Sequence, residues 1–283
     1  VSGSSQSAAS GTVQIRSAPA TKEGRVSGDV EIMTGSSTTG PTGDVIVGTG
    51  VSKGGRGGSV KLTAGAVESG IGGEVSLLGG RAKGDASIGG SVKLQSGVGT
   101  AKSGDLSMLS ARGSESGKSG DVVVGSGASA EGASGAVRVA SGASRDGSSG
   151  SVSIAVGDSG SGPGGDIVVA AGRSNKAVGG SVRVSSGRSA AAASGTVTVQ
   201  SADGKGVGGS GNVRVSTGSS AHGSSGAVEL GSGRSSDGRA GNVAVAVGAS
   251  MGDDSAGGDV VVKAGSSVGS KAVGGAVQIT SGS

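Results

Sequence analysis

The sequence contains no phenylalanine, tyrosine, tryptophan or cysteine, and it has only three prolines and one histidine. Aromatic side chains supply much of the volume of most globular cores, so their absence excludes a core of the usual kind in this chain of 283 residues. The absence of cysteine excludes disulfides and thiolate metal sites. No apolar run approaches the ~20 residues of a membrane helix, which predicts no membrane insertion.

Glycine accounts for 66 residues, a density that raises the entropic cost of ordering the chain. Such a composition fits either a flexible linker or a repetitive, hydrogen-bonded stack. The aliphatic residues recur in strict register, which a linker does not need, and this favours the stack. The 24 basic and 20 acidic residues are interleaved, and no aromatic ring is available for base stacking, so no nucleic-acid binding is expected.

The chain is built from a short unit that recurs mostly every fifteen residues. The unit reads small-Gly-x-aliphatic-x-aliphatic-x-small and is followed by a polar loop; residues 164–187 contain two copies. A fixed period of this kind is the signature of a repeat architecture. We call the second glycine of each unit its marker glycine. It occurs eighteen times, at Gly11, Gly28, Gly43, Gly58, Gly73, Gly90, Gly104, Gly120, Gly135, Gly150, Gly165, Gly180, Gly195, Gly211, Gly226, Gly241, Gly258 and Gly275.

Aliphatic residues lie two and four positions after each marker glycine, and we call these positions the first row and the second row. The first row is Val in sixteen units, with Leu106 and Ile167 in the others. The position six after the marker, the third row, is usually Ser, Thr or Ala, with Val156 and Val247 as large exceptions. This alternation, with its β-branched enrichment, predicts a strand with one buried face in each unit.

A longer period lies above the short one. Ala replaces the closing glycine of the strand at Ala18, Ala111 and Ala202, in the first, seventh and thirteenth units. The segments 72–80, 164–172 and 257–265 also correspond to one another. The sequence therefore predicts one domain, 1–283, with three super-repeats of six units at 10–102, 103–193 and 194–283. Residues 1–9 match the close of a preceding unit, and neither end resembles a cap, so we expect either a segment of a longer array or chains that stack end to end.

The predicted fold is all-β, a flattened parallel β-solenoid in which two sheets face each other across the aliphatic rows. Eighteen units would give about nine coils of about 30 residues. In it, Val169 and Val184 would face each other and Val168 would point outward. A triangular solenoid, with each unit stacked on the third one along, is the alternative. The small side chains favour two close sheets, because they would leave a three-sided interior hollow.

No constellation for catalysis or metal binding stands out. His222 is the only histidine and lies in a loop, without a second imidazole or thiolate to complete a transition-metal site. An Asp often follows the marker glycine, but the spacing of a calcium-binding nonapeptide is absent. No phosphate-binding loop or nucleophile with a base partner is present. We therefore expect no enzyme and no cofactor. The aspartates concerned are Asp29, Asp44, Asp105, Asp121, Asp166 and Asp259.

In its whole repeat style the chain resembles the Gly/Ser-rich β-solenoid repeats of extracellular adhesins, fibres and surface filaments. This resemblance implies an extracellular or cell-surface protein that forms a fibre or filament by end-to-end stacking of uncapped coils. The alternative is a surface-binding module for ice or polysaccharide. The chain also resembles flat antifreeze solenoids, but Thr196-Val197-Thr198 is the only triplet of their Thr-x-Thr type on a strand.

Four units carry a third aliphatic residue, three positions after the marker glycine. In the predicted strand it would point outward, and lateral packing between copies is the functional interpretation. The expected partner is thus the chain itself, end to end and laterally. We call these residues the outer set; they are Ile46, Val123, Val168 and Val261.

Overall fold

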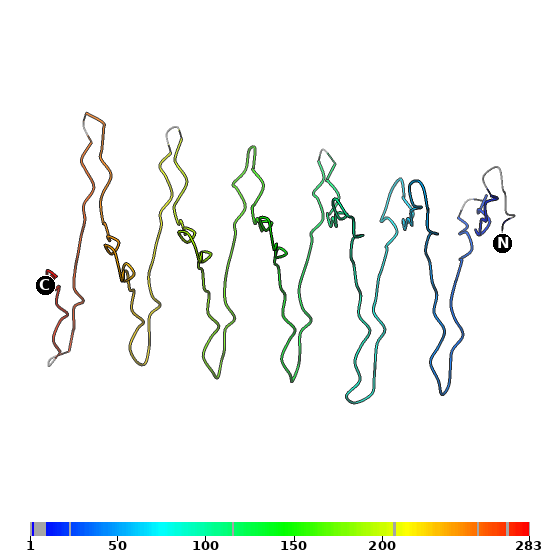
Figure 1. The fold of residues 1–283 in the computed structure, drawn as a ribbon, viewed down its shortest axis with the longest axis horizontal. Helices are drawn as coiled ribbons and strands as arrows, with labels where there is room; N and C mark the ends of the chain where they lie inside the picture. The colour runs from blue at the N-terminus through cyan, green and yellow to red at the C-terminus, as the bar shows by residue number, and fades with distance from the viewer. Residues whose placement is uncertain are drawn as a thin grey trace. The chain divides into compact units, whose positions relative to one another are not determined.

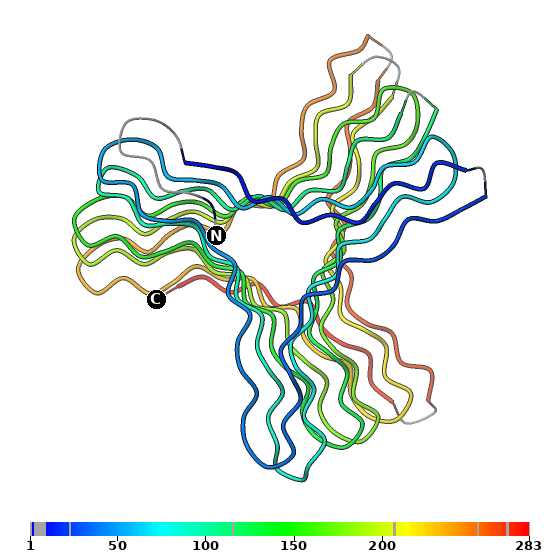
Figure 2. The ribbon, with the colours of Figure 1, turned by 90° about the vertical axis from the view of Figure 1, so that its right-hand side faces the viewer.

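The computed structural model describes residues 2, 10–22, 24–114, 116–205, 208–253, 255–269 and 272–282. Within these ranges the backbone forms extended segments joined by turns and bends, with no helix and no strand (Figure 1). A second view shows the same loops and extended segments, again without a strand arrow (Figure 2). The expected all-β solenoid is therefore wrong, whether drawn with two sheets or three, because no extended segment forms a hydrogen-bonded ladder with another.

The chain divides into two compact units, Val1–Val139 and Ala140–Ser283. Each contains nine of the marker glycines, and each has the same local build of extended segments and loops. The described parts have no cis peptide bond. Among these parts no helix is long and apolar enough to cross a membrane.

The accessible surface shows how little the chain buries. A folded monomer of 25.7 kDa exposes about 10,000 Å², and its unfolded chain about 37,000 Å². This chain exposes 28265 Å². The surface is therefore closer to that of an unfolded chain than to that of a globular protein.

No described residue is buried. The expected core of thirty-six aliphatic side chains is consequently absent, and Val169 and Val184 do not cover each other: they are 74% and 76% exposed. Without large side chains the rows have too little volume to fill the space between segments, so they stay open to solvent. Only five described residues are half-buried, and they are Ser17, Ser96, Gly113, Ser201 and Ala264.

The two-residue alternation nevertheless survives in the exposure pattern. In one repeat, Val122 in the first row is 56% exposed, Val123 in the outer set is 90% exposed and Val124 in the second row is 67% exposed. An extended backbone places successive side chains on opposite sides, so the rows share one side of each segment and the outer set lies on the other. The sequence pattern therefore defines sides of a segment, although nothing covers either side.

Backbone hydrogen bonds among the described residues join positions close in sequence and close turns or loops. A folded domain makes about one intramolecular hydrogen bond per residue, most of them in ladders. We therefore expect most amides of the dilute protein to exchange with D₂O at nearly the rates of the same chain in denaturant, within about tenfold. Hydrogen exchange measured by mass spectrometry checks this; protection of the row segments by several orders of magnitude in dilute monomer would contradict it.

Candidate functional site

The recurring close contact in the structure lies at the base of each loop. There the marker glycine of one unit faces the third-row residue of the unit before it. A Cβ built on Gly150 would lie 3.8 Å from the Cβ of Ser141, and one built on Gly180 would lie 3.2 Å from the Cβ of Ala171. The same pairing occurs in sixteen loops. The two ends of each of these loops therefore meet at this point.

Hydrogen bonds close several of these loop bases. Gly180 N–H donates to the carbonyl of Gly172 at 2.9 Å, and Gly195 N–H donates to that of Gly187 at the same distance. The acceptor is the glycine after the third-row residue, so the contact and the hydrogen bond lie side by side. Equivalent bonds join Gly73 to Gly65, Gly90 to Gly80, Gly104 to Gly97 and Gly275 to Gly265.

Two valines at the third row show how this contact tolerates a large side chain. The Cγ1 atoms of Val156 and Val247 lie 2.9 and 3.0 Å from where a Cβ would stand on Gly165 and Gly258. These valines are 45% and 47% exposed, less than any other large aliphatic side chain described. In these two loops the missing Cβ of the marker glycine leaves the room that the valine side chain occupies.

A serine at the tip of many loops holds a turn. The Ser144 Oγ accepts the N–H of Gly147 at 3.0 Å, and the Ser235 Oγ accepts that of Gly238 at 3.0 Å. Such side-chain-to-backbone bonds are the usual way in which serine stabilises a turn. The same bond recurs at Ser37, Ser129, Ser159, Ser174 and Ser189.

Other tips use glycine in a left-handed conformation instead. Gly70 and Gly223 have φ angles of 109° and 132°, which favour a residue without a Cβ. Gly223 follows His222 directly, so the single histidine occupies a turn and is exposed. These tips give the loops their shape.

The loop-base contact predicts rapid disulfide formation between cysteines placed there. A Cβ on Gly195 would lie 3.5 Å from the Cβ of Ser186, within the range that a disulfide spans. The variant with Ser186→Cys and Gly195→Cys should oxidise about fivefold faster than a control with Ala193→Cys and Ala202→Cys, the advantage expected from one net hydrogen bond. Both pairs enclose the same number of residues, so their random-coil closure entropy is equal.

Because the natural chain lacks cysteine, each variant forms one intramolecular product, and its rate is read from the loss of free thiol under dilute, buffered redox conditions. Equal rates for the two pairs would show that the loop base is not closed in solution.

The described residues contain no group of three or more His, Asp or Glu side chains placed to hold a metal ion. The six aspartates that follow marker glycines are all exposed. Lys102 and Asp105 form an ion pair at 3.3 Å, with side chains 78% and 82% exposed, and such a surface pair contributes little to stability.

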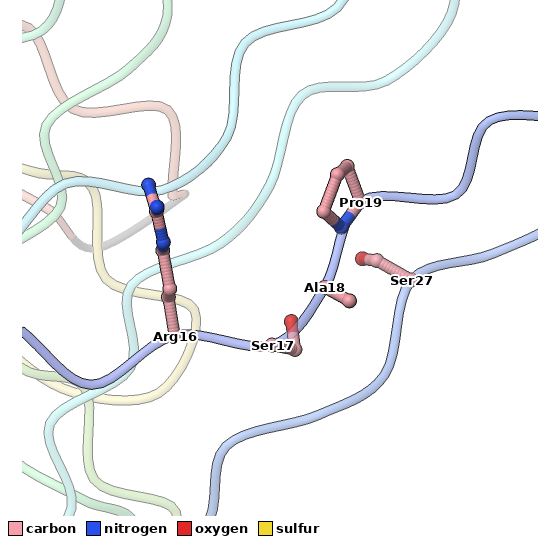
Figure 3. A pocket seen from close by; sticks show the side chains of 5 residues that line it. All are labelled: Arg16, Ser17, Ala18, Pro19 and Ser27. Carbon is pink, nitrogen blue, oxygen red and sulfur yellow. The ribbon is translucent and has the colours of Figure 1, made fainter.

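The best-formed hollow in the described chain has a volume of about 680 Å³ and is lined by Arg16, Ser17, Ala18, Pro19 and Ser27. Arg16 points away from the other four side chains, so its guanidinium does not converge with the two serine hydroxyls (Figure 3). All lining residues except Ser17 are exposed. The hollow is thus an open space between two segments and lacks the convergent polar groups of a ligand site.

The four residues of the outer set are almost fully exposed to solvent. Ile46, Val123, Val168 and Val261 are 81–90% exposed. They come from four different repeats, and their role in lateral contacts stays a prediction. The loop-base pairing, by contrast, escaped the sequence-based interpretation. Its signal is the coincidence of an unvarying glycine with a third-row residue that is usually small, a pattern that the strand prediction places on the buried face of a sheet.

Comparison of the chain with protein-family models, with curated proteins and with solved structures finds no match in any of the three.

Proposed function

We propose that this is a structural protein whose chains associate with one another to form a fibre or filament. The observation that carries the proposal is the regular pair of aliphatic rows, repeated eighteen times on one side of the extended segments and left open to solvent. Repeated exposed apolar side chains of this number favour an interaction surface, because soluble monomers rarely leave so much apolar surface open to water. Stacked solenoid coils are not the means of association, since the single chain forms none.

The charges and the loops support the same proposal. A net charge of +4 on 283 residues, with both signs interleaved, opposes close packing of copies only weakly. The extended segments also present backbone N–H and C=O groups that are available to another chain. An extracellular or cell-surface location remains a prediction from the resemblance in repeat style, as does the alternative of an ice- or polysaccharide-binding module.

The proposal predicts assembly of the purified protein above a threshold concentration. Burial of the rows between copies follows mass action, so the dilute chain stays monomeric and the concentrated chain forms filaments. Sedimentation velocity over a concentration series, with electron microscopy of the same samples, measures this. A chain that remains monomeric throughout the soluble range, or that forms only shapeless aggregates, contradicts the proposed function.

A further inference from the structure

We propose that copies of this chain pack against one another through the side chains of the first and second rows. The rows of one copy contact the same rows of another copy. This inference rests on the proposed function and names the side chains responsible for it. Every first-row residue is 51–61% exposed, and every second-row residue is at least 58% exposed. Row residues are therefore accessible to a partner in every unit.

The area available is large enough for a stable interface. Full burial of an aliphatic side chain removes roughly 60–120 Å² of apolar surface from water. Thirty-six side chains that are half or more exposed therefore carry on the order of 1,000–3,000 Å². A standard protein interface buries about 800 Å² on each partner. The rows of one chain meet or exceed this area without any contribution from the outer set.

The period of the repeat selects a copy as the partner. The rows present apolar side chains in pairs, with a polar loop after each pair and a spacing that varies only between fourteen and seventeen residues. A partner must present apolar groups with this spacing and must leave room for the loops between them. A second copy meets both requirements along its whole length.

The geometry of the segments separates the rows from the outer set. In the repeat at Gly43, Val45 is 53% exposed and Ile46, its neighbour in sequence, is 88% exposed on the opposite side. The rows occur in all eighteen units, whereas the outer set occurs in four. Packing through the rows therefore buries a continuous pattern, and packing through the outer set would bury isolated side chains.

Two matched quadruple variants test the inference. The row variant carries Thr at Val45, Val122, Ile167 and Val260, and the outer variant carries Thr at Ile46, Val123, Val168 and Val261. Each set replaces three valines and one isoleucine, in the same four units and at adjacent positions. Threonine keeps the size and β-branching of valine but places a hydroxyl where no partner is available if the site is buried.

We expect the row variant to raise the threshold concentration for assembly about a hundredfold or more, and the outer variant to change it by less than about fivefold. A third variant, with Ile at Val45, Val122 and Val260, keeps the row apolar and should stay within about fivefold of the natural protein. Sedimentation of the full chain measures all three thresholds. Electron micrographs of the same samples measure the width of filament bundles, which reports lateral contacts between filaments.

The outcomes separate the two proposals. If the natural chain assembles and the outer variant raises the threshold as much as the row variant does, the inference is overturned and the proposed function stands. The same holds if neither variant changes the threshold. If the natural chain forms no filaments at any concentration, the proposed function fails and takes this inference with it.

Discussion

The approach of the marker glycine to the third-row residue before its loop, seen in sixteen loops, is the contact on which the described structure depends. It joins residues of neighbouring units and costs little closure entropy, because the loop it closes is short. Gly180 against Ala171 and Gly195 against Ser186 illustrate it, each with a backbone hydrogen bond beside it. The contact is close enough that a Cβ on the marker glycine would stand 2.9–3.9 Å from the third-row side chain in sixteen loops.

A contact of this kind organises the chain locally and cannot stabilise it globally. One net hydrogen bond contributes about 1 kcal/mol, whereas ordering the backbone of one residue costs about 1–2 kcal/mol. Burial of apolar surface normally offsets that cost, and here no described residue is buried. The aliphatic rows are the part of the apolar surface that recurs in every repeat. An ordered form of this protein consequently needs something to cover the rows from outside the chain.

The sequence predicts some levels of this structure better than others. The alternation around residues 122–124 correctly assigned Val123 to the side opposite Val122, because side-chain direction in an extended segment depends only on local backbone geometry. The step from extended segments to a sheet failed, because a sheet also needs a second segment at hydrogen-bonding distance, and no local pattern supplies one. Likewise, Ala171 and Ser186 were assigned to a core when their size instead reflects the glycine that faces them.

The same distinction explains why the described residues bring no group of three His, Asp or Glu side chains together for a metal ion. A reactive site needs side chains from different segments to converge in a place that excludes water. Here the polar groups of the described loops stay open to water, as at His222 and in the exposed Lys102–Asp105 ion pair. What the repeats hold in common is one apolar side and a fixed spacing. Those two properties favour association over chemistry, because many weak, identical contacts add up only when a partner offers the same spacing.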